Sequence, residues 1–96
     1  MVRRRAAVVG AGHTRFGVLP EGPRVLLRTA VEQAFVCVDK GLDRSIVDEA
    51  YLGSLGFGGW QIGNASAVLA EEAGIVGAPV THVENACASA GFSIST

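Results

Sequence analysis

The chain has 96 residues, of which 49% are hydrophobic and 18% are charged, and its formal net charge is −1. This length suits one modest domain over 1–96, and the near-neutral charge gives no basic field that would favour nucleic acid. No run approaches the roughly 18 consecutive apolar residues that a membrane helix needs. Two cysteines without a C-x-x-C spacing make neither a disulfide framework nor a metal site, and they favour the reduced cytoplasm.

The first half of the chain predicts a strand, a long helix and a short helical turn. A short apolar run, "AAVV" at 6–9, predicts a buried strand of a parallel sheet. Apolar residues then recur at helical spacing: Leu27, Ala30, Val31, Ala34, Phe35 and Val38. This stripe predicts a helix that begins near Pro23 and ends at Gly41. A single turn is expected at 45–47, with Asp48 as its capping partner.

The second half predicts two more strands, at 50–55 and 80–84, and a helix at 65–73. Asn64 is the expected N-cap of that helix and Gly74 its stop, after a glycine-rich loop. The small residues around Cys87 predict the start of a third helix. The order is therefore β-α-β-α-β followed by a helix start, which indicates an α/β fold with helices packed on a parallel or mixed sheet.

The segment "VVGAGHTRFG" is similar to a dinucleotide-binding fingerprint after a strand, but its spacing differs. Gly10 and Gly12 supply G-x-G, whereas Arg15 stands where the third small residue is needed. No acidic residue ends the second predicted strand to bind a ribose. We therefore interpret His13 and Arg15 as residues that shape a turn.

Cys87, in "VENACASAGFSIST", is the candidate nucleophile. It follows a predicted strand and stands at a predicted helix start, where unpaired N–H groups and partial positive charge stabilise a thiolate. Small residues at 88–91 leave room for an acyl group or another backbone to approach the sulfur. The alternative is a small cysteine packed between helix and sheet, and the local sequence leaves both open. His82 is expected to hydrogen-bond a neighbour, and Cys37 to be a small packed or half-packed residue beside the apolar stripe of the first helix.

Several motifs together resemble the N-terminal segment of the thiolases, especially the archaeal and sterol-carrier-type branch of acetyl-CoA acetyltransferases. The opening "VVGAGHTRFG" is similar to that branch at five positions: Gly10, Gly12, Thr14, Phe16 and Gly17. "DEAYLGSLGFG" resembles the family's strand and glycine-rich loop, and "VENACASAG" resembles the segment around its nucleophile. Ala90 departs from the pattern, because the family usually has glycine there.

The resemblance implies a partial thiolase-like N-terminal half, in which Cys87 takes an acyl group from acyl-CoA as a thioester. The CoA thioester is then a substrate, and no cofactor or metal is implied. The family's oxyanion-hole histidines and second, basic cysteine lie further downstream, so the chain alone is expected to be nearly inactive. Its high apolar content also predicts a homo-oligomer or a companion chain that supplies the rest of the fold.

Two other interpretations of the sequence remain. The chain could be a non-catalytic remnant or binding module that associates with related subunits. It could also be an unrelated small α/β domain with a buried cysteine. The chain reaches Thr96 inside the predicted third helix, so a single incomplete domain is expected.

Overall fold

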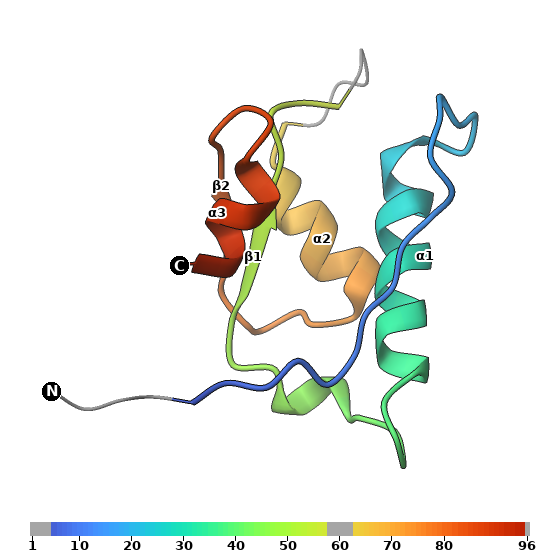
Figure 1. The fold of residues 1–96 in the computed structure, drawn as a ribbon, viewed down its shortest axis with the longest axis vertical. Coiled ribbons are helices and arrows are strands. Elements are labelled where there is room, and N and C mark those ends of the chain that lie inside the picture. Colours follow the sequence, from blue (N-terminus) through green and yellow to red (C-terminus); the bar gives the residue numbers. More distant parts are fainter. Residues whose placement is uncertain (1–4, 58–62, 96) are drawn as a thin grey trace, which may run out of the picture.

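The computed structural model describes residues 5–57 and 63–95 of the chain. Within these ranges the helical elements are α1 (Gly22–Val36), η1 (Arg44–Ile46), α2 (Ala65–Ala73) and α3 (Ser89–Ser95), and the strands are β1 (Ala50–Gly53) and β2 (Val80–Val83). Figure 1 shows their arrangement. No helix in the described part of the chain is both long and apolar enough to cross a membrane.

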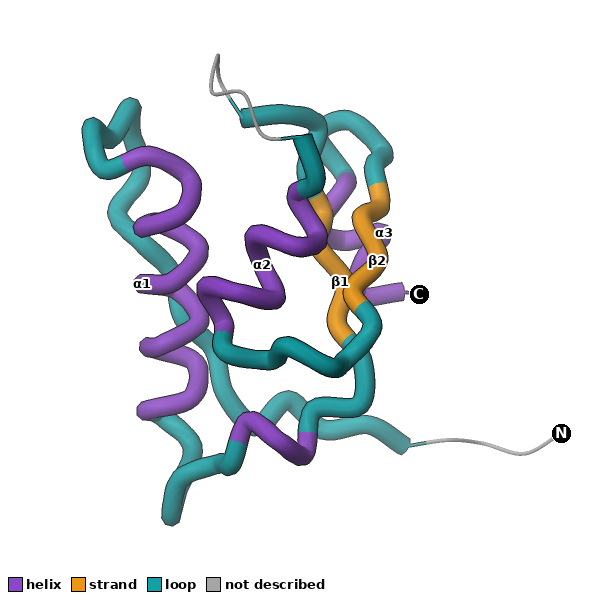
Figure 2. The backbone as a smooth tube through the Cα atoms, turned by 180° about the vertical axis from the view of Figure 1, so that it is seen from behind, coloured by secondary structure: helices purple, strands orange, loops and turns teal. Residues whose placement is uncertain are grey.

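The two strands form a parallel sheet whose register runs from Ala50 opposite Val80 to Gly53 opposite Val83. Helices α2 and α3 each contact both strands and do not contact one another, so they cover opposite faces of the sheet. Helix α1 packs on α2, away from the strands, as Figures 1 and 2 both show. The layers are therefore α1, α2, sheet and α3, and the predicted α/β class is confirmed.

The core lies between the sheet and α2. Its buried apolar residues are Leu52, Ala65, Leu69, Ala73 and Ile75. Leu27 and Val31 of α1, both on the predicted apolar stripe, pack against this cluster from outside. The apolar stripe of α1 is therefore covered by the core cluster, as expected for an amphipathic helix.

The bounds of α2 are those predicted from the sequence. The Asn64 side chain accepts a hydrogen bond from the backbone N–H of Ala67 at 3.2 Å, which satisfies one unpaired donor of the first turn. Gly74 ends the helix in the left-handed region, with φ of 68°. The N-cap Asn64 and the C-terminal Gly74 thus begin and end α2 at the residues that the sequence predicted.

Helix α1 ends at Val36, before the predicted stop at Gly41. Val38, the last residue of the predicted stripe, leaves the helix and packs beside Gly10 of the N-terminal segment. The cap predicted at Asp48 is also wrong. Asp43 has extended backbone immediately before η1, and its carboxylate accepts from the Ser45 N–H at 2.9 Å, whereas Asp48 lies after the turn.

The strand predicted at 6–9 does not form, and the described sheet has two strands instead of the expected three. The N-terminal segment instead passes along α1, where a Cβ on Gly10 or Gly12 would overlap the carbonyl oxygen of Ala34 or Ala30. A strand forms only by hydrogen bonding to the edge of another strand. Residues 6–9 lack such a partner because the residues that follow them, Gly10 and Gly12, lie against α1. Most of the predicted glycine-rich loop, and Thr96, lie outside the described residues.

Candidate functional site around Cys87

Cys87 lies in the turn between β2 and α3, and it is exposed. Helix α3 begins at Ser89, two residues after the cysteine, so the predicted helix start is nearly correct. The alternative of a packed cysteine is wrong. The buried residue of this turn is Ser89, whose exposed fraction is 4%.

The backbone just before Cys87 has an unusual conformation. Ala86 has φ of 47°, one of two positive values among non-glycine residues in the described part of the chain. Such a residue costs on the order of 1–3 kcal/mol and persists where its surroundings fix it. Here the Glu84 carboxylate accepts a hydrogen bond from the Ala86 N–H. Within the same turn the Ala88 N–H donates to the Asn85 carbonyl at 2.9 Å.

The Ser89 hydroxyl holds the other side of the turn. Its Oγ accepts from the Asn85 N–H at 2.9 Å and donates to the Ala86 carbonyl at 2.7 Å. The Ser89 N–H donates to the same carbonyl at 3.2 Å. One buried side chain thus connects the first helical residue to the peptide group that precedes Cys87.

Gly53 of β1 allows α3 to approach the sheet this closely. A Cβ at Gly53 would lie 2.5 Å from the Ser89 carbonyl oxygen and 2.9 Å from the Ala90 nitrogen. Sequence reasoning missed the roles of Glu84, Ser89 and Gly53. The small residues that follow Cys87 predicted a close approach by an acyl group or by another backbone, and the structure places the backbone of β1 against Ser89 and Ala90.

His82 is hydrogen-bonded to a neighbour, as predicted. Its Nε2 donates to the Ser54 carbonyl at 2.9 Å, which connects β2 to the chain just after β1. No hydrogen bond between His82 and Cys87 is present among the described residues. The structure therefore gives His82 a structural bond and does not pair it with the candidate nucleophile.

Cys37 is exposed, so the packed or half-packed position expected for it is wrong, although its sulfur makes contacts on two sides. Its sulfur accepts from the Ala11 N–H at 3.3 Å and donates to the Ala34 carbonyl at 3.3 Å. Together with the close approach of Gly10 and Gly12 to α1, this contact fixes the G-x-G segment on the helix. These glycines therefore allow the N-terminal segment to lie close against α1.

His13 and Arg15 shape the turn that follows, as predicted. The His13 ring stacks on Phe16 with ring centroids 6.1 Å apart, and its Nδ1 lies 2.8 Å from the Thr14 carbonyl oxygen. Arg15 forms an exposed ion pair with Glu21 at 3.1 Å. Neither residue contacts the turn that carries Cys87.

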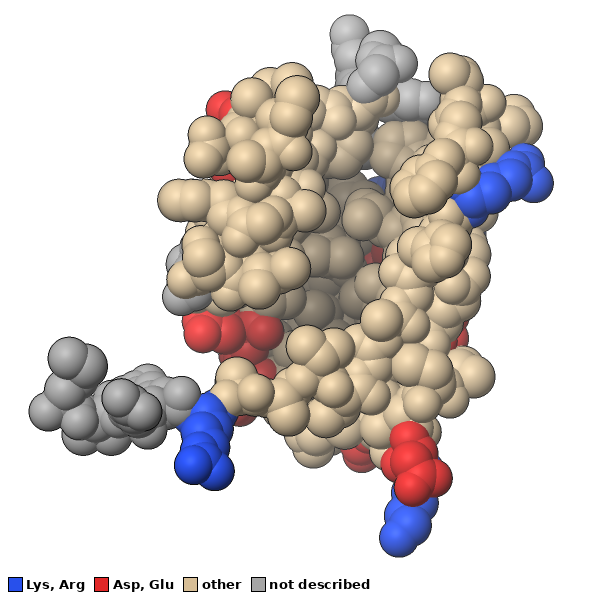
Figure 3. All heavy atoms as spheres, in the orientation of Figure 1, with Lys and Arg blue, Asp and Glu red and all other residues tan. Residues whose placement is uncertain are grey.

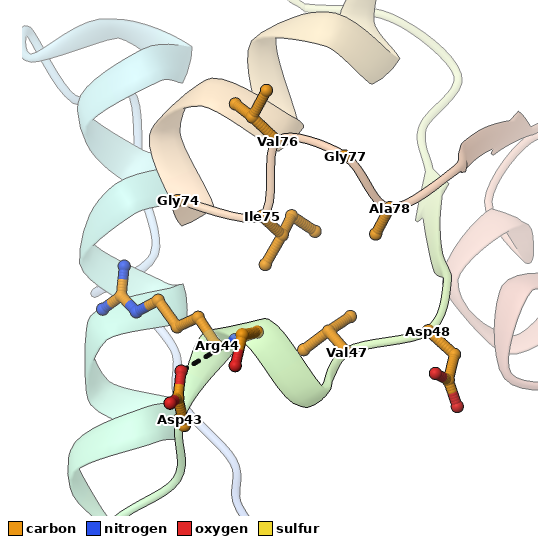
Figure 4. Close-up of a pocket in the computed structure, with 10 residues that line it drawn as sticks. Asp43, Arg44, Val47, Asp48, Gly74, Ile75, Val76, Gly77 and Ala78 are labelled. Carbon is orange, nitrogen blue, oxygen red and sulfur yellow. Dashed lines mark hydrogen bonds between the residues drawn. The ribbon is translucent and has the colours of Figure 1, made fainter.

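A cavity of about 650 Å³ lies between η1 and the loop after α2 (Figure 4). Ile75 and Val47 project into it, whereas the Arg44 side chain extends toward α1. Arg44 Nη1 donates to the Ala73 carbonyl at 2.8 Å, and its guanidinium lies 4.8 Å from the centroid of the Phe35 ring. Cys87 does not line this cavity. Among the described residues no group of His, Cys, Asp and Glu could hold a metal ion.

Two curated relatives that the chain matches carry the same name. No family model matches the chain. It is 35% identical over 94 residues to the acetyl-CoA acetyltransferase of Methanocaldococcus jannaschii, and 32% identical over 94 residues to that of Methanothermobacter thermautotrophicus. Each alignment covers 95% of this chain but 23% and 24% of the respective relative. The resemblance to acetyl-CoA acetyltransferases is therefore confirmed, for a chain that spans about a quarter of the length of the curated relatives it matches.

Proposed function

We propose that this chain, similar over nearly all its length to acetyl-CoA acetyltransferases, is the nucleophile-bearing part of a thiolase-like acyltransferase. Cys87 is the residue that accepts the acyl group from acyl-CoA, in a reaction of the acetyl-CoA C-acetyltransferase type. The observation that carries the proposal is the exposed thiol of Cys87 on a turn that Glu84 and Ser89 hold on both sides.

The reaction exchanges one thioester for another. The Cys87 thiolate attacks the acyl carbonyl carbon, an S–C bond forms, and the bond from that carbon to the CoA sulfur breaks. The departing CoA thiolate takes up a proton equivalent to the one that Cys87 lost, so no oxidant or reductant takes part. The neighbours Ala88, Ala90 and Gly91 leave space for the acyl chain, and the Ala90 methyl group narrows that space slightly.

We further propose that a companion chain or a second copy completes the fold. The accessible surface of the chain is 7227 Å², whereas a compact monomer of 9.9 kDa exposes about 5,200 Å². Figure 3 shows the face between α3 and α1 hollowed and lined mostly by uncharged atoms. Several large apolar side chains are also exposed, among them Val8, Phe16, Val18 and Ile94. Surface of this kind and size is usually covered by another chain.

The acyl transfer of the isolated chain should be slow. One oxyanion-hole donor alone contributes about 10²–10³ in turnover, and no such donor is assigned within the described residues. We place the protein in the cytoplasm, since both cysteines are free thiols and such thiols persist in a reducing compartment.

Mass spectrometry after incubation with acetyl-CoA tests the assignment of Cys87. We expect a single acetyl group on the intact chain, mapped to the peptide that contains Cys87. Cys87→Ala should remove the label and Cys37→Ala should keep it, because both thiols are exposed and only one is proposed to react by acyl transfer. Equal labelling of the two cysteines would indicate simple thiol exposure. Absence of label with and without a co-purifying partner would refute the proposal.

The uncovered surface also favours a second candidate, a non-catalytic module that binds related subunits. Light scattering after size exclusion at micromolar concentration distinguishes the candidates when it is combined with the labelling experiment. Association without acetylation of Cys87 would favour the binding module, and association with acetylation the enzyme part. A monodisperse monomer at these concentrations would contradict the proposed companion or second copy.

A further inference from the structure

We propose that Ser89 is a positioning residue for Cys87, an inference that depends on the acyl-transfer role proposed above. Ser89 is the buried polar residue in the described part of the chain, with an exposed fraction of 4%. Burial of a hydroxyl is unfavourable unless its hydrogen bonds are satisfied. Both bonds of this hydroxyl go to the backbone of the turn that carries Cys87, at Asn85 and Ala86.

The second of these bonds bears directly on the cysteine. The Ala86 carbonyl belongs to the peptide group that joins Ala86 to Cys87, and that peptide is planar. Ser89 binds this oxygen twice, through Oγ at 2.7 Å and through its N–H at 3.2 Å. Because the plane of this peptide sets where the Cα and the side chain of Cys87 begin, Ser89 fixes the direction in which the thiol leaves the turn.

Ala86 has a backbone conformation that is unfavourable for alanine, so the surrounding hydrogen bonds must stabilise it. A φ of 47° is unfavourable for a residue with a Cβ, and it is kept by bonds on both sides. The Glu84 carboxylate binds the Ala86 N–H, and Ser89 binds the Ala86 carbonyl. Without the Ser89 hydroxyl, Ala86 can relax toward negative φ, and the thiol then moves relative to an acyl group bound beside it.

The experiment uses the 96-residue chain in a Cys37→Ser background, so that Cys87 is its one thiol. Acetylation by acetyl-CoA is timed by intact mass, and alkylation by iodoacetamide is timed in parallel. Ser89→Ala should slow acetylation about ten-fold or more, since displacement of a reacting group by about 1 Å can cost 10²-fold. Alkylation, which needs only an exposed thiol, should stay within about three-fold of the parent.

Two further variants separate positioning from a general effect on α3. Ser89→Thr keeps the hydroxyl and should restore most of the acetylation rate. Ser93→Ala removes a hydroxyl of the same helix that donates to the Ala90 carbonyl at 2.7 Å, away from the turn, and should leave both rates unchanged. A Ser93→Ala effect equal to that of Ser89→Ala would overturn the inference.

The outcomes distinguish this inference from the proposed function. If the parent chain is acetylated on Cys87 and Ser89→Ala is acetylated equally fast, the positioning role is wrong and the proposed function stands. If the parent is acetylated neither alone nor together with a co-purifying partner, the proposed function fails and the positioning role with it. Should Ser89→Ala lose its circular dichroism signal, hydrogen exchange of the parent decides. Slow exchange of the Asn85 amide supports the bond to Ser89, and unprotected exchange overturns it.

Discussion

Replacement of Gly53 by alanine tests how closely α3 approaches the sheet. The new Cβ would lie 2.5 Å from the Ser89 carbonyl oxygen, 2.7 Å from the Ser89 carbonyl carbon and 2.9 Å from the Ala90 nitrogen. Ordinary non-bonded contacts are about 3.5 Å or longer, so the first of these atoms is about 1 Å too close. All three are backbone atoms, and relief therefore requires that α3 shift as a unit.

The expected magnitude is the difference of two opposing effects. Inserting a methyl group into a packed contact costs about 1–3 kcal/mol. Loss of glycine from a strand contributes about 0.5–1 kcal/mol in the opposite direction, because the unfolded chain becomes less flexible. We expect Gly53→Ala to lower the free energy of unfolding by about 1–2 kcal/mol, whereas strand propensity alone predicts a gain.

Urea unfolding followed by circular dichroism measures this difference. Gly91→Ala in α3 is the matched control, because a Cβ there meets nothing within 4 Å and the helix should gain about 1 kcal/mol. A midpoint for Gly53→Ala at or above that of the parent would refute the close approach of α3 to β1. It would also remove the structural basis for the burial of Ser89.

Two further predictions concern local caps. Asn64→Ala should lower the free energy of unfolding by about 1 kcal/mol, since it leaves the Ala67 N–H unpaired, and a urea midpoint unchanged from the parent would contradict this. The backbone N–H of Ser45 donates to Asp43 and lowers the pKa of that carboxyl below 3.8. A lowered pKa in the folded state stabilises the fold above pH 3.8, and this contribution is lost as the pH falls through the folded-state pKa. Asp43→Asn should therefore lose less stability than the parent between neutral pH and pH 3, and equal losses would show that Asp43 is not the group concerned.

The sequence by itself determined the features that depend on neighbouring residues. The apolar stripe of α1 depends only on a spacing of 3.6 residues. The ends of α2 depend on single residues: the hydrogen bond of Asn64 at its start and the positive φ of Gly74 at its end. These signals predicted α2 to the residue and α1 in most of its length. The sequence also placed Cys87 just after a strand and at a helix start, from the end of an apolar run before small residues, and the helix begins two residues later, at Ser89.

The tertiary structure decided the features that depend on close contact between distant segments. Gly10 and Gly12 lie on α1 and hold the residues before them away from the sheet, so the strand predicted at 6–9 has no partner. Gly53 has no side chain, so the backbone of Ser89, 36 positions later, can lie against it. This close contact leaves Ser89 buried, and its hydroxyl bonds to the turn beside Cys87. The sequence does not distinguish a glycine that excludes a Cβ, such as Gly53, from one with open space around it, such as Gly91, because the atoms that surround each glycine are known only once the chain has folded.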